Sequence, residues 1–166
     1  MWELEGIRGH GPQPNEIGAY AGPAIICAGA QGVYEEYDAA GAMLRAAGMP
    51  NYATFAVNEI GAFLRAHLHA IITAHPENAD LWLSRRARMQ MGNVPLIYAD
   101  HSHPIANVIF DNMGFEAGSS GLVACLITLC MGYSPIIACG MSINYHGASF
   151  HSPYAWGVVD ASHKVI

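Results

Sequence analysis

The chain has few charged residues: Asp, Glu, Lys and Arg make up 12% of its 166 residues, about half of the usual share. Only 7 are Lys or Arg against 13 Asp or Glu, and the formal net charge is -6. Proteins that bind nucleic acid directly use clustered cations to neutralise phosphates, so this class is disfavoured. The one basic cluster, RRAR at 85–88, is expected to form a solvated helix face. Scarce charge predicts elements covered on both sides, or a homo-oligomer that hides part of the surface.

Several motifs of common functional sites are also missing. The four cysteines form no CxxC pair, so each is expected to be a small buried hydrophobe in a reducing cytoplasm. Neither a Gly-Lys-Ser/Thr P-loop nor a GxGxxG fingerprint occurs, which disfavours the usual ATPase and dinucleotide sites. No HxxxH pair lies on a predicted helix, so we expect no metal and no cofactor. The N-terminus also lacks the apolar run of a signal peptide.

The longest uncharged run, GLVACLITLCMGYSPIIACGM at 121–141, contains 21 residues. A membrane helix of about 20 residues would carry Gly132 and Pro135 through its middle, without Lys or Arg at its ends. The run therefore predicts a helix, a turn and a buried strand, and no membrane span.

Apolar runs alternate with helical patterns along the chain. Strands are expected at 24–28, 53–57, 70–74, 95–99 and 136–141, and helices at 34–47, 62–68, 77–91 and 121–132. The segment 105–118 fits either a connecting strand or a loop. This alternation predicts an α/β, Rossmann-like fold with a mostly parallel five- to six-stranded sheet and helices on both faces. The expected strand order is 3-2-1-4-5. Residues 23–145 would form the domain, after an irregular arm at 1–22 and before a tail or truncated lid at 146–166.

Polar residues follow every expected strand. Ligands of such sheets bind outside the carboxyl ends of the strands, so these residues are candidates for a site. They are found at 29–32, 58–59, 75–78, 100–103 and 142–146. The turn Gly118–Ser119–Ser120–Gly121 precedes a helix, whose unpaired N–H groups and partial positive charge suit a phosphate. The glycine turn at 29–32 is a second candidate of this kind.

Four histidines are candidates for a general base, because the pKa of a histidine lies near neutrality. They are His75, His101, His146 and His151, and their order stays open.

The run GSSGLVACLITLCMGYSPIIACGMS resembles a segment of bacterial lipooligosaccharide sialyltransferases: Ser-Gly, an apolar helix, a glycine turn and a strand. AIICAGAQGVYEEYD is similar to their first strand and nucleotide loop, and FAVNE to their second strand. AHPE matches the place where that family has Asn-Pro. Uncharacterised phage and prophage proteins share this pattern, which covers residues 24–144 here.

The resemblance implies a substrate-binding role for eight residues: Ala30, Gln31, Asn58, His75, Ser119, Ser120, Gly121 and Ser142. Asn144, among the polar residues after the last expected strand, is a further substrate-binding candidate. Among the eight, Asn58 would hold the nucleotide or the donor sugar, and Ser119 to Gly121 the cytidine or its phosphate. Ser142 replaces the family's acidic residue after the last strand. Catalysis would fall to His151, His146 and Tyr154, where the family has a lid. These departures affect catalysis more than ligand binding.

The leading hypothesis is a nucleotide-sugar-binding, glycosyltransferase-like protein in a bacterial host. A histidine would deprotonate the acceptor hydroxyl, and a helix N-terminus would stabilise the departing phosphate. The alternative is a non-catalytic structural or assembly protein, including a phage virion protein, on a decayed transferase fold. A third hypothesis is a hydrolase of a phosphate or nucleoside that uses the histidines.

Overall fold

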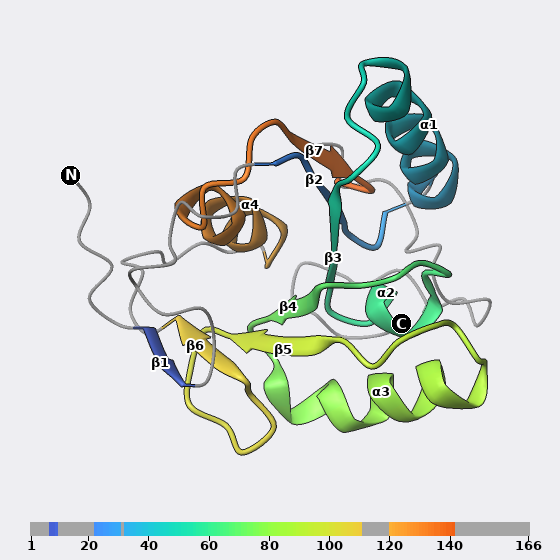
Figure 1. The fold of residues 1–166 in the computed structure, drawn as a ribbon. Coiled ribbons are helices and arrows are strands. Elements are labelled where there is room, and N and C mark those ends of the chain that lie inside the picture. Colours follow the sequence, from blue (N-terminus) through green and yellow to red (C-terminus); the bar gives the residue numbers. More distant parts are fainter. Residues whose placement is uncertain (1–6, 10–21, 31, 111–119, 142–166) are drawn as a thin grey trace.

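A single sheet organises the protein, as a computed structural model that describes residues 7–9, 22–30, 32–110 and 120–141 shows (Figure 1). The sheet has seven strands in the order β1-β6-β5-β4-β3-β2-β7. They are β1 (Ile7–Gly9), β2 (Ala24–Cys27), β3 (Ala53–Val57), β4 (Ala70–Thr73), β5 (Leu96–Ala99), β6 (Val108–Phe110) and β7 (Ile136–Cys139). Strands β2 to β7 are parallel, and β1 pairs antiparallel with β6. The predicted Rossmann-like α/β fold is confirmed.

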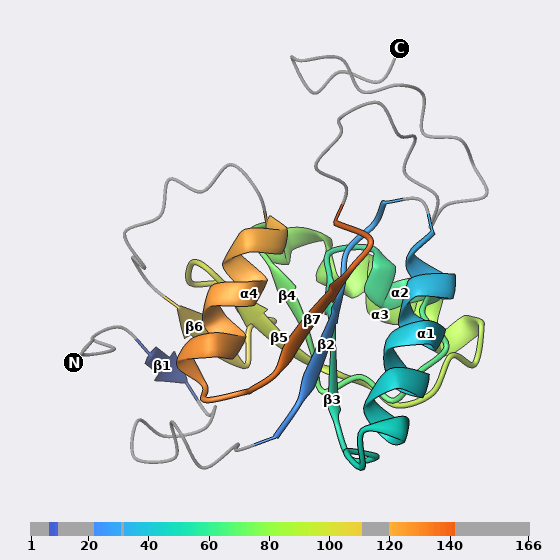
Figure 2. The same cartoon turned by 90° about the horizontal axis from the view of Figure 1, so that it is seen from above.

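Helices cover both faces of the sheet, as expected. They are α1 (Val33–Ala46), α2 (Ile60–Phe63), α3 (Ala79–Arg88) and α4 (Ser120–Cys130). Figure 2 shows α1, α2 and α3 on one face and α4 on the other. Every side chain of β2 and β4 is buried for this reason, which explains why these strands are apolar at successive positions. The expected helix at 77–91 is shorter, because a 3-10 turn at Pro76–Asn78 precedes α3.

The predicted strand order is wrong for the last two expected strands: it put β7 beside β5, whereas β7 pairs with β2. The order 3-2-1-4-5 placed the fourth expected strand, β5, beside β2, whereas β5 pairs with β4. The sheet grows in one direction from β2 to β6, because each crossover on that side advances by one strand. The chain then crosses the other face through α4 and adds β7 beside β2. The segment left open between strand and loop contains β6.

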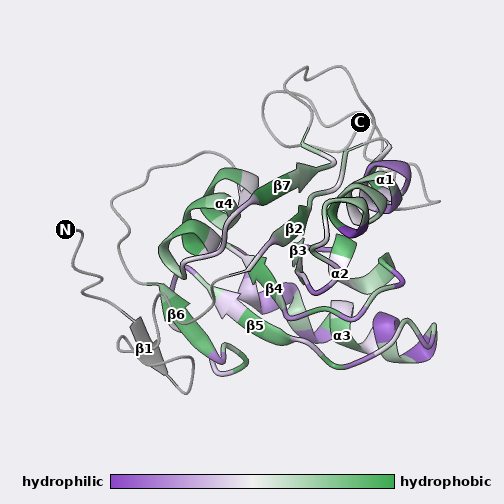
Figure 3. Cartoon of the chain, turned by 45° about the horizontal axis from the view of Figure 1, so that its top comes forward, coloured by the Kyte–Doolittle hydropathy of each residue, from purple (hydrophilic) through white to green (hydrophobic). Residues whose placement is uncertain are grey.

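The run at 121–141 folds as a helix followed by a strand, α4 and β7. Among the residues that the structure describes, no helix is long and apolar enough to span a bilayer. The surface of α4 is nevertheless hydrophobic on much of its circumference, whereas α1 and α3 carry hydrophilic residues (Figure 3). Leu122 and Leu129 of α4 are each 59% exposed.

The basic cluster at 85–88 is not a uniformly solvated face, so this expectation is wrong for Arg86. Its side chain is 2% exposed. The guanidinium donates hydrogen bonds to the backbone carbonyls of Gly61, Leu64, Ala66, Met91 and Asn93. Arg86 thereby connects the backbone at 61–66, in and after α2, to the backbone at 91–93, after α3.

An aromatic cluster packs beneath α4 around His69. The ring of His69 lies edge-on to Phe55 at 5.1 Å, and its Nε2 lies 3.2 Å from the hydroxyl of Tyr98. Burial lowers the pKa of His69, and the nearby His67 adds to the effect. The folded protein therefore favours the neutral imidazole.

Stability is expected to fall as the pH drops below about 6.5, the ordinary pKa of histidine. In the unfolded chain His69 is protonated at about that pH. In the folded protein its pKa is lower, so His69 is protonated only at a more acidic pH. The contribution of neutral His69 to stability is therefore complete above its pKa in the unfolded chain. It is lost as the pH falls from that value to the pKa in the folded protein, at no more than about 1.4 kcal/mol per pH unit. Urea unfolding between neutral and acidic pH should show a shallower decline for His69→Gln than for the exposed-site control His75→Gln. Equal declines would contradict this assignment.

Candidate functional site

The carboxyl ends of the parallel strands meet at one edge of the sheet. The register places Cys27 beside Ala56 and Cys139, Val57 beside Ile72, and Thr73 beside Ala99. Five segments therefore follow their strands at this edge, at 28–30, 58–59, 74–75, 100–101 and 140–141. We call it the carboxyl edge. It brings together Ala30, Asn58 and His75 of the expected substrate-binding residues.

A fixed chain of hydrogen bonds occupies the middle of the carboxyl edge. The backbone N–H of His75 donates to Thr73 Oγ1 at 2.7 Å, and Thr73 Oγ1 donates to Asn58 Oδ1 at 2.8 Å. Asn58 itself has φ 54, a left-handed conformation that is uncommon outside glycine. Its own N–H donates to the carbonyl of Ile72. Among the described residues, none accepts a hydrogen bond from Asn58 Nδ2, while Asn58 Oδ1 is held by Thr73.

Two described histidines of the edge lie beside carboxylates. His101 Nδ1 is 2.6 Å from Asp100 Oδ1, and His75 Nδ1 is 3.4 Å from Glu77 Oε1. Both imidazoles are more than half exposed. The contact with Asp100 orients the imidazole of His101, with Nδ1 toward the carboxylate.

The N-terminus of α1 is already occupied by acidic side chains. Glu35 and Glu36 lie in its first turn, where they complement the partial positive charge of the helix. Glu36 Oε2 also accepts the N–H of Gly140 at 2.6 Å, across the boundary between β2 and β7. An additional anion would be repelled here. The glycine turn at 29–32, which holds Ala30, is therefore a poor place for a phosphate.

The N-terminus of α4 carries no such acid. Ser120 is its first residue and is half-buried, while Gly121 is buried. The first turn contains no acidic residue. The phosphate site expected at this helix end stays a prediction.

Seven predicted site residues lie outside the described residues, so their roles stay predictions. They are Gln31, Ser119, Ser142, Asn144, His146, His151 and Tyr154. Within the described residues, no group of three or more His, Cys, Asp or Glu side chains could hold a metal ion.

Sequence reasoning missed two residues of the carboxyl edge. Thr73 orients Asn58, and Glu36 binds Gly140 across 104 positions of the chain. A threonine that ends an otherwise apolar strand was the available signal for Thr73. Nothing in the local sequence signals Glu36, because its partner Gly140 follows β7, which joins the sheet much later in the chain.

Comparisons with protein-family models, curated proteins and solved structures found no match to the chain. The fold, a Rossmann-like parallel α/β sheet, is compatible with nucleotide binding.

Proposed function

We propose that the protein binds a nucleotide or nucleotide sugar at the carboxyl edge and is a glycosyltransferase-like protein. The main support is the side-chain amide of Asn58. Thr73 holds its oxygen, and among the described residues none accepts a hydrogen bond from its nitrogen. The left-handed backbone of Asn58, which asparagine adopts more readily than most non-glycine residues, ends β3 and turns the chain at the carboxyl edge. Asn58 would donate to the sugar or the base, as the resemblance to sialyltransferases implies.

The charges of the carboxyl edge support one orientation of the nucleotide in the proposed site. Its phosphates would point toward the N-terminus of α4, because Glu35 and Glu36 already occupy that of α1. Neutral donors from the backbone and from Ser120 would hold them, in keeping with the absence of a P-loop lysine. If the protein transfers the sugar, His101 is the described residue best arranged to deprotonate an acceptor, since Asp100 fixes its ring.

A thermal-shift titration with CMP-, UDP- and GDP-sugars and free nucleotides tests the proposal. At a ligand concentration about 100-fold above Kd, we expect the wild-type Tm to rise by roughly 5–10 °C. Asn58→Gly should abolish most of this shift, because glycine keeps the left-handed backbone and removes only the amide. Asn51→Gly is the matched control, since exposed Asn51 precedes β3 at the opposite edge of the sheet, and it should respond as the wild type does.

No stabilisation by any of these compounds at millimolar concentration would rule out nucleotide binding. Light scattering on the same samples then distinguishes the alternative, a non-catalytic assembly protein. A large, stable oligomer without nucleotide response would favour that alternative, to which the exposed leucines of α4 would contribute an apolar contact. A shift retained by Asn58→Gly would place the ligand elsewhere.

A further inference from the structure

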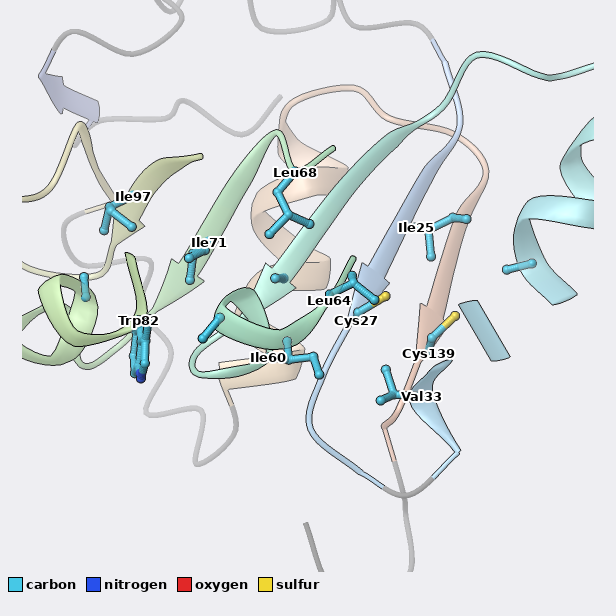
Figure 4. Close-up of a cluster of buried hydrophobic side chains, with 14 of the residues drawn as sticks. Ile25, Cys27, Val33, Ile60, Leu64, Leu68, Ile71, Trp82, Ile97 and Cys139 are labelled. Atoms are coloured by element: carbon cyan, nitrogen blue, oxygen red, sulfur yellow. The ribbon is translucent and has the colours of Figure 1, made fainter. Parts of the chain in front are cut away.

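Two cysteines lie side by side on the neighbouring parallel strands β2 and β7. Cys27 ends β2 and Cys139 ends β7, and the two are direct partners in the parallel register. Both belong to the same core cluster, on the face covered by α1, with exposed fractions of 0% and 1%. Figure 4 shows both side chains on the same side of the sheet, near Val33. The other two cysteines, Cys125 and Cys130, are on α4 at the opposite face.

The register brings the pair within the range of a disulfide. Neighbouring strands lie about 4.8 Å apart, and the Cα atoms of disulfides are usually about 4.4–6.8 Å apart. We propose that Cys27 and Cys139 form a peroxide-sensitive thiol pair, which closes to a disulfide that ties the carboxyl ends of β2 and β7 together. A disulfide is broken again when a thiolate attacks one of its sulfurs and a mixed disulfide forms. The closure is therefore reversible.

Cys139 lies on β7, the strand at the end of the sheet, so we expect its sulfur to meet the oxidant first. The thiol of Cys27 donates a hydrogen bond to this sulfur, which lowers the pKa of Cys139 against the opposing effects of burial and of Glu36. The same hydrogen bond and burial raise the pKa of Cys27. The Cys139 thiolate attacks hydrogen peroxide, so that an S–O bond forms, the O–O bond breaks and hydroxide leaves as water with the thiol's proton. Cys27 then attacks the sulfenic sulfur, the S–S bond forms and a second water leaves with the proton of Cys27.

The position of the pair determines which oxidants can reach it. Both sulfurs are buried, so bulky thiol reagents are excluded from the closed structure. β7 pairs only with β2 among the described strands, and such an edge strand opens more easily than a central one. Opening at Cys139, beside Gly140, would admit a molecule as small as peroxide. This proposal does not depend on nucleotide binding.

The pair can be isolated in the variant Cys125→Ala/Cys130→Ala, because the chain contains four cysteines in all. After peroxide treatment of the folded protein, we expect its intact mass to fall by two hydrogen atoms and its thiols to resist alkylation after denaturation. Dithiothreitol should restore both thiols. The control Cys125→Ala/Cys139→Ala keeps Cys27 and Cys130 on opposite faces and should gain oxygen atoms or stay unchanged.

Peptide mapping of oxidised wild-type protein reports the Cys27–Cys139 linkage directly, so the test does not depend on how well a variant folds. Proximity in the fold should make the ratio of the Cys27–Cys139 disulfide to oxygen adducts at least about tenfold higher in buffer than in urea. The proposal is overturned if the pair variant gains oxygen without forming the disulfide, or if the bond forms only in urea. A thermal shift with nucleotides would be unaffected by either outcome.

Discussion

Replacing Arg86 by methionine is expected to lower the free energy of unfolding by about 4 kcal/mol, because a buried carbonyl that loses its donor costs about 1–3 kcal/mol. Methionine fills much of the same space but donates no hydrogen bond. The variant would leave the backbone carbonyls that now accept from Arg86 without a donor. Among them are those of Leu64 and Asn93, whose oxygens lie 2.8 Å and 2.7 Å from guanidinium nitrogens. The expected loss in Tm is roughly 10 °C.

Arg88→Met is the matched control, since Arg88 is in the same last turn of α3 and is exposed. A surface substitution of this kind usually changes stability by no more than about 0.5 kcal/mol. Urea unfolding of both variants measures the difference. Arg86→Lys should fall between them, because an ammonium has fewer donors and cannot reproduce the planar fork. Equal stability of Arg86→Met and Arg88→Met would show that the buried hydrogen bonds contribute little.

Gly140→Ala is expected to cost about 3 kcal/mol, by combining a strained backbone with a steric clash. Gly140 has φ +64, and a Cβ there would lie 2.2 Å from the carbonyl oxygen of Ala28 and 2.8 Å from Cβ of Val33. Neither neighbour can move freely, because the carbonyl belongs to the backbone and Val33 begins α1. The substitution should therefore loosen the contact between β7 and the turn after β2.

Gly48→Ala separates the two causes. Gly48 has φ +76 but would place its Cβ in open space, so its cost should be only about 1 kcal/mol. Urea unfolding of the two variants gives the clash as the difference between their free energies of unfolding. If Gly140→Ala costs no more than Gly48→Ala, the close approach to Ala28 is not a constraint on the fold.

The predicted elements follow from local patterns in the sequence. Apolar strands such as AIIC and AIIT are recognisable because their residues are buried on both faces of the sheet. The pattern at 121–141 likewise contains its own turn, so it predicts α4 and β7 rather than a membrane span. Strand order is different, since a crossover of similar length can add a strand on either side. The sequence offered no signal that β5 pairs with β4.

Some features of the candidate site were likewise predictable from the sequence, and others depend on the fold. Asn58 was predicted from its place after an apolar strand, and the structure puts it at the carboxyl edge. Its orientation by Thr73 depends on a neighbouring strand. The acid at the N-terminus of α1 was visible in the sequence, but its hydrogen bond to Gly140 was not. That bond holds a carboxylate at the N-terminus of α1, whereas the first turn of α4 contains no acidic residue.

The sequence by itself determined the class of fold, because hydrophobic periodicity and glycine stops are properties of neighbouring residues. Tertiary structure decided which strands lie side by side, and with them every long-range contact. Arg86 illustrates the difference: its sequence neighbours suggest a solvated face, yet the carbonyls around it make burial favourable. Cys27 and Cys139 are 112 positions apart and become partners only because α4 returns the chain to β2.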